Sequence, residues 1–565
     1  MKQKLTKVVA LVCALTCMGT TLTACQPGKG PLGGQLVTDS SKTQLYVGNY
    51  DGGFGHKWLD LYKAGFEELY KNESFEKGKK GVEVVILNDK VSYFSSNLLS
   101  TMDQSNIDIV FTEEADYYEF ISSTRGTLLY DMTSWVKETL PGEQRSIEAK
   151  LNDQQKEYYT SYNKKYYGLP HFQSMRGLIY DVDLFNEKSL FIKADGSIAG
   201  KSTDTDLSNG PDGMPNTYDD GMPATYDELW RWCEYVTQPT VGVTPFCWTG
   251  TYMEAYSQYL EDALMVDFLG REAGQYYFSP SEGSVTMDLI RSFDGDGNPV
   301  ITSETISREN SYDMCYLAAG YYMLDFWKHI LENGWYYDMS MNSLTTHDVI
   351  HYDYLRSNVN KTDDLKPIAF MIEGAWWENE SDYIFEQLDA AYPDEKASRK
   401  ERTFGYMPLP KARAEYAGKM TLLDANNAIM FANANIKGKP EEDIAKKFVQ
   451  YISTDANLQL FTTTTGIPRD YDVDLTPEQL ATLSPYAQQI WDIRQSAEGI
   501  VYKRYNSYND KTYGKLNGGS VGFRETMEAD FTTFHGMPLA VFTTEETKNM
   551  TAREYFEGVI RMYAD

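Results

Sequence analysis

The sequence has few cysteines, few basic side chains relative to acidic ones, and no long hydrophobic run after its N-terminal segment. It contains 52 lysines and arginines and 82 aspartates and glutamates, which gives a formal net charge of −30. Such a charge repels nucleic acid and anionic lipid, so neither is an expected partner. The lack of a run of about 20 apolar residues excludes a transmembrane helix from the body of the chain.

The cysteines are too few for a disulfide-stabilised scaffold. Of the six, Cys13 and Cys17 lie in the N-terminal segment. Beyond position 25 the chain retains Cys233, Cys247 and Cys315, an odd number without the spacing of a metal site.

The N-terminus has the pattern of an export signal. Three lysines precede an uncharged, mostly apolar run over residues 8–18, which is too short to span a bilayer. The run leads to Leu22-Thr23-Ala24-Cys25, which resembles a bacterial lipobox. We therefore expect residues 1–24 to be removed as a lipoprotein signal peptide. Cys25 is then expected to carry the lipid that anchors the protein to the outer face of the bacterial cytoplasmic membrane.

The chain after the signal alternates between strand-like and helical patterns. Residues 25–43 are rich in small and polar residues and predict a flexible tether. After them, short β-branched runs alternate with amphipathic helical periods, which predicts an α/β fold with mainly parallel sheets. About 540 residues exceed one core and predict at least two lobes. The predicted strands are 45–49, 82–87 and 107–111, and the predicted helices are 57–70, 93–102 and 226–236.

Four segments resemble extracellular solute-binding proteins of ABC importers. They are "KKYYGLPHFQSMRGLIYDVDLF" (164–185) and residues 107–136, 426–469 and 368–380, the last of which, "IAFMIEGAWWENE", is similar to the maltodextrin-binding branch. The resemblance implies a periplasmic-binding-protein-like fold, in which two α/β lobes joined by a multi-crossing hinge close on a ligand in the cleft between them. It further implies a monomeric binding protein, not an enzyme, that delivers an oligosaccharide to an ABC permease without a required cofactor.

The same resemblance gives expected lobe boundaries. Lobe 1 is expected to comprise residues 44–174 and 432–466, and lobe 2 residues 175–431 and 467–565.

Residues that match the family's ligand-facing positions are the candidate binding residues. An aromatic ring covers the C–H face of a pyranose, while carboxylates and other polar groups hold its hydroxyl edges. Trp376 matches a stacking tryptophan, and Glu373 ends the strand before it. The sequence leaves open whether Trp376 or its neighbour Trp377 faces the ligand. The other candidates are Trp248, Tyr252, Trp58, Glu113, Glu114, Asp116 and Arg176.

Other functions remain as alternatives. A surface glycoside hydrolase needs two carboxylates roughly 5–9 Å apart, which so many acids do not exclude. A peptide or metal-chelate binder on the same fold is a further alternative. The segment "GGSVG" (518–522) matches the hydrolase pattern Gly-x-Ser-x-Gly, but polar residues precede it where a buried strand is required.

An acidic segment at 203–229 predicts a calcium site. So many carboxylates in a compact loop repel one another unless a hard cation neutralises them. An acidic solvated loop before a helix with Thr225 as its N-cap is the competing interpretation. The candidate ligands are Asp204, Asp206, Asp212, Asp219 and Asp220.

Two further motifs suggest metal binding only at first sight. His347 and His351 in "HDVIH" have the spacing of a zinc pair on a helix, but Asp348 stands where zinc proteases carry glutamate. The segment 293–301, "FDGDGNPVI", starts like a calcium loop, but Pro299 and two flanking strand-like runs favour a hairpin turn.

Overall fold

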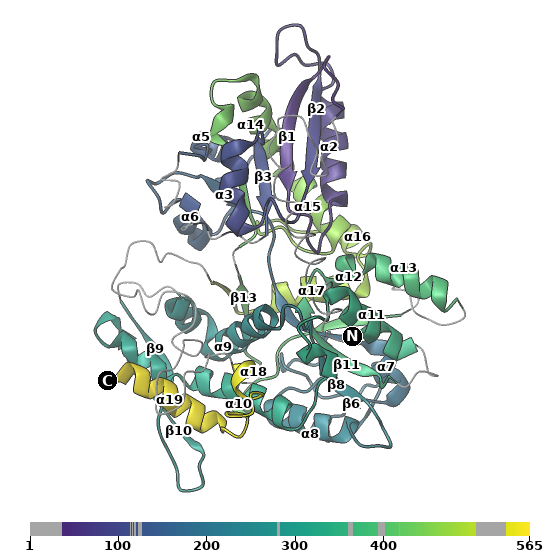
Figure 1. The fold of residues 1–565 in the computed structure, drawn as a ribbon, viewed down its shortest axis with the longest axis vertical. Helices are drawn as coiled ribbons and strands as arrows, with labels where there is room; N and C mark the ends of the chain where they lie inside the picture. The colour runs from purple at the N-terminus through teal and green to yellow at the C-terminus, as the bar shows by residue number, and fades with distance from the viewer. Residues whose placement is uncertain are drawn as a thin grey trace, which may run out of the picture. The chain divides into compact units, whose positions relative to one another are not determined.

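The computed structural model describes residues 37–564 apart from 114, 116, 118–119, 122–126, 279–282, 360–364, 394–401, 417, 426 and 504–537. Cys25 and the segment 518–522 therefore lie outside the described residues. The chain forms two compact units (Figure 1). Unit 1 contains the described residues up to Phe172 together with 427–464 and 469–474. Unit 2 contains 173–426, 465–468 and the described residues from 475 onward.

Unit 1 is built on a five-stranded sheet with the order β2–β1–β3–β14–β4. Its strands β1 (Thr43–Asn49), β2 (Val82–Asn88) and β3 (Ile109–Thr112) are parallel. The strand β14 (Ile429–Ala432) returns from unit 2 and runs antiparallel to β3 and to β4 (Gly168–Pro170). The parallel half confirms the predicted βαβ units.

Helices cover the unit 1 sheet because right-handed crossovers place them there. Helix α2 (Lys57–Tyr70) connects β1 to β2, and α3 (Ser95–Gln104) leads back past β1 to β3, so the two helices lie on opposite faces (Figure 1). Helix α2 buries Trp58, Leu59, Tyr62 and Phe66, which share one face at the helical period. The other helices in the described part of unit 1 are α5 (Thr133–Lys137), α6 (Asp153–Tyr159), α14 (Pro440–Ile452) and α15 (Asp455–Thr465).

Unit 2 contains a four-stranded mixed sheet with the order β12–β5–β11–β8. The strands are β5 (Arg176–Asp181), β8 (Thr244–Cys247), β11 (Ile368–Gly374) and β12 (Phe404–Met407). β11 is parallel to β8, whereas β5 is antiparallel to both of its neighbours. The prediction of a mainly parallel sheet is therefore wrong for unit 2. β5 is the first strand of this sheet in the chain, so no strand–helix–strand connection within the sheet leads into it. The preference for parallel strands on either side of such a connection therefore does not set its direction.

Helices and small β-elements surround this sheet. Helix α8 (Tyr226–Val236) begins at the predicted N-cap, since the Thr225 hydroxyl accepts a hydrogen bond from the Glu228 backbone N–H. The other helices are α7 (Val182–Lys188), α9 (Met253–Phe278), α10 (Ala318–Glu332), α11 (His347–Val359), α12 (Trp377–Glu380), α13 (Asp382–Ala391), α16 (Pro477–Leu480), α17 (Pro485–Ser496), α18 (Pro538–Val541) and α19 (Ala552–Ala564). In the part of the chain that the structure describes, every helix is too short or too polar to cross a membrane.

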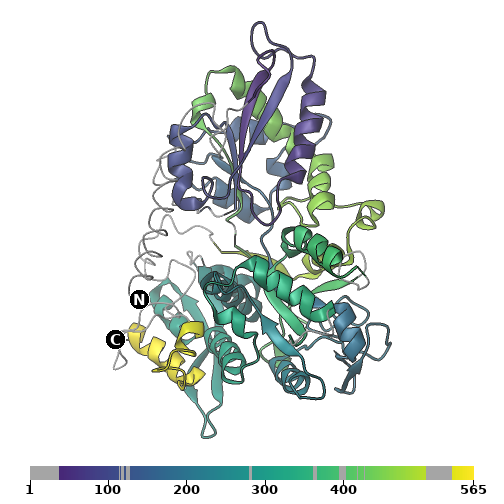
Figure 2. The same cartoon turned by 45° about the vertical axis from the view of Figure 1, so that its right-hand side comes forward.

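A hairpin and two short strand pairs complete unit 2. Strands β9 (Ser284–Phe293) and β10 (Pro299–Ser307) are antiparallel, which confirms the predicted hairpin turn. Helix α10 packs against β9 and against the C-terminal helix α19, shown in yellow in Figure 2. The short pairs are β6 (Phe191–Ile192) with β7 (Ile198–Gly200) and β13 (Thr421–Asp424) with β15 (Gly499–Tyr502).

Candidate functional site

The strand β11 ends in a tight turn that carries the tryptophan pair. All seven residues of β11 are buried because it lies between β5 and β8. A Cβ added at Gly374 would lie 2.3 Å from the Trp376 ring, so glycine is required where this ring folds back over the backbone. The next residue, Trp377, begins helix α12 and is fully buried. The two tryptophans therefore have different environments.

Trp376 belongs to a group of rings and one guanidinium, which we call the aromatic–arginine group. The guanidinium carbon of Arg176 lies 3.4 Å from the ring centroid of Tyr259 and 5.0 Å from that of Trp376. Arg176 is the β5 residue that pairs with Gly374, and Tyr259 comes from helix α9. The Arg176 Nη1 also donates a 3.0 Å hydrogen bond to Ser174. The three side chains are each partly exposed, so they present apolar faces and N–H and O–H donors together.

Glu373 is buried directly beneath this turn. One of its carboxylate oxygens accepts a 2.7 Å hydrogen bond from the Gly374 N–H, and the other lies 3.1 Å from the Nε2 of His351. The Tyr256 hydroxyl also hydrogen-bonds to this carboxylate. Burial raises the pKa of Glu373 to about 7, against the lowering effect of these hydrogen bonds. With 1% of its surface exposed, Glu373 reaches solvent far less than Trp376 does.

The other predicted residues of unit 2 differ in exposure. Trp248, which follows β8, is 1% exposed and contacts the rings of Trp327 and Tyr336. Tyr252, just before α9, is 47% exposed. Trp248 thus lies in the core, whereas Tyr252 lies at the surface.

Unit 1 carries the remaining predicted residues. Trp58 is 1% exposed and packs within 5.5 Å, between ring centroids, of Tyr62, Phe111, His171 and Phe461. Glu113 follows β3 and is partly exposed. A Cβ at Gly52 would lie 2.3 Å from a Glu113 carboxylate oxygen, so this glycine admits the carboxylate. Glu114 and Asp116 lie outside the described residues.

Sequence reasoning missed two residues that contact the predicted ones. Tyr256 bonds Glu373, and Tyr259 stacks on Arg176. A signal was present, because Tyr252, Tyr256 and Tyr259 are spaced to share one face of a helix. The predicted set included only Tyr252.

The acidic segment 203–229 divides into two groups of carboxylates. Asp204 and Asp206 form ion pairs with Lys193, at 3.5 and 3.1 Å. Asp212 and Asp219 lie together, since the Asp212 backbone N–H donates a 2.9 Å hydrogen bond to the Asp219 carboxylate. In this fully described segment no three acidic side chains lie within 4.8 Å of one another.

Within this segment, the pKa of a carboxyl group is raised most clearly at Asp219, a member of the buried pair. Asp219 is fully buried, and burial raises its pKa to about 7, with a smaller contribution from the Asp212 charge and against the lowering effect of the Asp212 backbone hydrogen bond. Asp220 accepts a 2.8 Å hydrogen bond from the Asn216 backbone N–H. The Thr217 hydroxyl lies 3.3, 2.9 and 3.5 Å from carboxylate oxygens of Asp212, Asp219 and Asp220. The structure thus groups Asp204 with Asp206 at Lys193, and Asp212 with Asp219 and Asp220 at Thr217.

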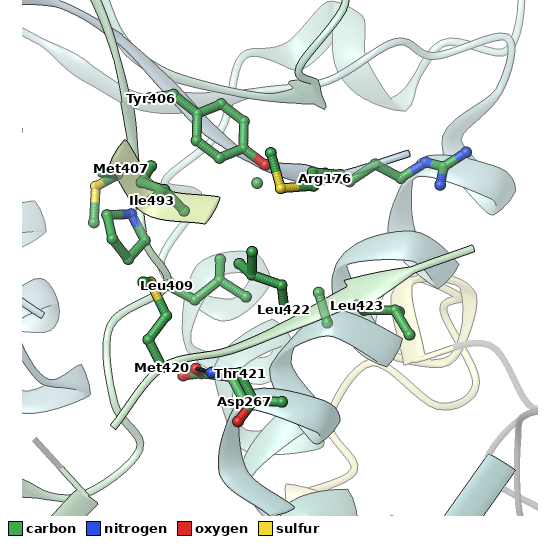
Figure 3. A pocket seen from close by; sticks show the side chains of 14 residues that line it. Arg176, Asp267, Tyr406, Met407, Leu409, Met420, Thr421, Leu422, Leu423 and Ile493 are labelled. Atoms are coloured by element: carbon green, nitrogen blue, oxygen red, sulfur yellow. Dashed lines mark hydrogen bonds between the residues drawn. The ribbon is translucent and has the colours of Figure 1, made fainter. Parts of the chain in front are cut away.

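A mostly apolar pocket lies near the start of β5 (Figure 3). It has an empty volume of about 410 Å³, part of which is open to solvent. Tyr406 and Met407 lie on one side and Met420, Thr421 and Leu422 on the other (Figure 3). Six of its fourteen lining residues are methionine or leucine, and its polar side chains are those of Arg176, Asp267, Tyr406 and Thr421.

The chain matches a family of known proteins over most of its length. A family model described as bacterial extracellular solute-binding protein matches residues 73–479. No curated protein matches the chain.

Solved structures show the same fold at low sequence identity. A chitin oligosaccharide binding protein has a TM-score of 0.53 and 12% identity, covering 93% of this chain and 99% of that one. A complex of the solute-binding protein RafE with raffinose has a TM-score of 0.50 and 14% identity, covering 92% and 99%. A probable secreted solute-binding lipoprotein from Streptomyces coelicolor has a TM-score of 0.51 and 11% identity, covering 93% and 100%. These likenesses confirm the predicted periplasmic-binding-protein-like α/β fold.

Proposed function

The chain belongs to the bacterial extracellular solute-binding proteins, and we propose that it captures an oligosaccharide for an ABC transporter. The observation that carries the proposal is the aromatic–arginine group of Trp376, Arg176 and Tyr259, described above. The named ligands of similar structures, chitin oligosaccharide and raffinose, support a sugar as the ligand class.

The group has the chemistry that a sugar requires. A partly exposed indole or phenol ring can cover the C–H face of a pyranose, and the Arg176 guanidinium offers fixed donors to hydroxyl oxygens. Tyr252 is 47% exposed and immediately precedes the helix that carries Tyr259, so it is a second candidate aromatic contact. Glu373 lies beneath the group, where it would hold the Tyr256 side chain in place by a hydrogen bond and would not touch the ligand.

Replacing Trp376 with alanine tests the proposal. A glycan panel screened by thermal shift first identifies a ligand, which at a hundred times Kd adds about 2.7 kcal/mol to the stability of the parent. Trp376→Ala should weaken binding of that ligand by roughly 1–3 kcal/mol, by analogy with stacking of bases on aromatic rings. Titration calorimetry measures the loss, and Tyr312→Ala, at an exposed aromatic residue outside the group, is the control. Sugar binding by Trp376→Ala at the parental affinity would refute a stacking role.

Product analysis on each hit separates a binder from an enzyme. Intact sugar after prolonged incubation is expected, because the matched family consists of binding proteins. Cleavage of the glycosidic bond would instead support a glycoside hydrolase.

We expect lipid at Cys25 to attach the protein to the membrane, as the lipobox-like sequence predicts. Cys25→Ala should release the protein from the membrane fraction or leave its leader uncleaved, because the substituted residue has no thiol to lipidate. Fractionation with mass analysis of the N-terminus measures both results, and Cys315→Ala is the control. Normal processing and membrane retention in Cys25→Ala would contradict the prediction.

Calcium at the segment 203–229 also remains a prediction. If Asp212 and Asp219 contribute ligands, EGTA should lower the melting temperature, and added calcium should restore it. Asp212→Asn should abolish this sensitivity, whereas Asp206→Asn, at a carboxylate paired with Lys193, should retain it. Identical melting of the parent with and without EGTA would favour a solvated acidic loop.

A further inference from the structure

Helix α11, strand β11 and helix α12 bring a histidine and two glutamates together inside unit 2. Among the described residues, His351, Glu373 and Glu380 each place one potential ligand atom within 4.8 Å of the others. His351 and Glu373 are buried, and Glu380 is partly buried. The ring of Trp377 lies 6.4 Å from that of His351, between centroids, and Tyr354 packs against Trp377. Three potential ligands thus converge at a place that bulk water reaches poorly.

We propose that this cluster binds a divalent transition-metal ion, best matched by Zn²⁺, through the Nε2 of His351 and the carboxylates of Glu373 and Glu380. The site lies beneath the sugar surface, with which it shares Glu373, and it is separate from the calcium segment. It adds a structural metal to the proposed function and does not depend on it.

The spacing fits a tetrahedral ion. Ligands at about 2.0–2.2 Å from zinc are separated from one another by about 3.3–3.6 Å. The His351 Nε2 and a Glu373 oxygen are already 3.1 Å apart. Glu380 lies at the end of the four-residue helix α12, which begins three residues after β11 ends, so both glutamates belong to one short segment. Small side-chain rotations bring the third ligand into range.

A fourth ligand position has a candidate at the edge of the cluster. The Nε2 of His347, one helical turn before His351, lies 3.8 Å from a Glu380 carboxylate oxygen. The two imidazole centroids are 5.9 Å apart. The two histidines of "HDVIH" thus lie near two glutamates that are 22 and 29 residues beyond His351 in the chain. Either His347 or water completes the coordination.

Neighbouring groups orient the ligands as they do in zinc proteins. The Nδ1 of His351 lies 3.1 Å from the Ser381 hydroxyl, which leaves Nε2 directed at the carboxylates. The Gly374 N–H and the Tyr256 hydroxyl hold the Glu373 carboxylate. Such contacts from outside the ligand set fix the tautomer and the orientation of ligating side chains, and their loss weakens metal binding by about 10–100-fold.

The donor set favours zinc over calcium or magnesium. Calcium takes six to eight oxygen ligands and magnesium an octahedron of oxygens, so neither selects imidazole. A set of one or two imidazoles with carboxylates suits zinc and related ions. Zinc binds imidazole and carboxylate groups in their unprotonated forms, so its binding releases protons to solvent.

Zinc titration of the chelator-stripped full-length protein, without sugar, tests the proposal. One equivalent of Zn²⁺ should bind and raise the melting temperature, and Ca²⁺ should not compete. Co²⁺ in its place should give the visible absorption bands of a four-coordinate site. Glu380→Gln and His351→Gln should each weaken zinc binding by at least about 10-fold. His329→Gln, at a histidine on α10 that also pairs with an aspartate, is the matched control and should bind zinc like the parent.

Each contrary result overturns the proposal. Failure of the parent to bind zinc shows that the cluster is not a zinc site. Equal zinc affinity in the parent and in Glu380→Gln, whose side chain is partly exposed, shows that the ion binds elsewhere, even if His351→Gln fails to fold. Loss of zinc binding in His329→Gln alone identifies an adventitious surface site. Sugar binding is measured separately, so failure of the oligosaccharide proposal leaves this result intact.

Discussion

Trp377→Ala is expected to lower the free energy of unfolding by roughly 3–5 kcal/mol, because it removes a fully buried indole from a close-packed set of rings. Five rings surround Trp377 with centroids 5.0–6.4 Å away, from His351, Tyr354, Phe385, Phe404 and Tyr486. These come from α11, α13, β12 and α17, so the cavity would lie where four elements meet. Urea denaturation followed by circular dichroism measures the loss.

Two further variants separate packing from other effects. Trp377→Phe should cost less than Trp377→Ala, since it keeps an aromatic ring and removes an indole N–H that is buried without a hydrogen-bond partner. Trp376→Ala should also cost less, because Trp376 is partly exposed. Equal losses in Trp376→Ala and Trp377→Ala would show that both tryptophans serve the core and would weaken the sugar proposal.

Local patterns predicted much of the fold because they are set by neighbouring residues. The helical period gave α2 and α8 at their observed bounds, and Thr225 was identified as a cap from its hydroxyl and position alone. Strand direction in unit 2 was not predictable in this way. The direction of β5 depends on its pairing with β11, in which Tyr180 pairs with Phe370 and Arg176 with Gly374, far apart in the chain.

In the candidate site too, the residue types could be predicted from the sequence, whereas contacts between residues distant in the chain could not. Aromatic residues at 376 and 377 were visible in the sequence, but their different burial, with Trp377 fully buried and Trp376 partly exposed, was not. Trp58 and Trp248 looked equally suited to a ligand, yet their rings contact residues far away in sequence and lie in the cores of their units. Composition cannot assign such contacts, since tryptophan suits a core and a sugar site equally well.

Arg402→Met is the second change with a large expected effect. The Arg402 Nε donates a 2.7 Å hydrogen bond to the carboxylate of Asp181, and the two residues are 5% and 0% exposed. Asn358 and the Leu184 N–H complete the partners of Asp181, at 3.2 and 3.1 Å. Removing one member of a buried ion pair leaves an uncompensated charge, and we expect a loss of roughly 3–5 kcal/mol in the free energy of unfolding.

The loss should depend on pH with a definite sign. Burial already raises the pKa of Asp181 against the lowering effect of Arg402, so Arg402→Met should raise the folded-state pKa further. The folded variant then binds a proton more readily than its unfolded chain, and its stability should fall as pH rises from the unfolded pKa towards the folded one. Urea titrations should therefore show a larger difference from the parent at pH 8 than at pH 5. Arg402→Met combined with Asp181→Asn removes the stranded charge and keeps an acceptor for Leu184, so it should recover part of the loss and flatten the pH dependence. A double variant as unstable as Arg402→Met at both pH values would show that Arg402 contributes through packing and not through its charge.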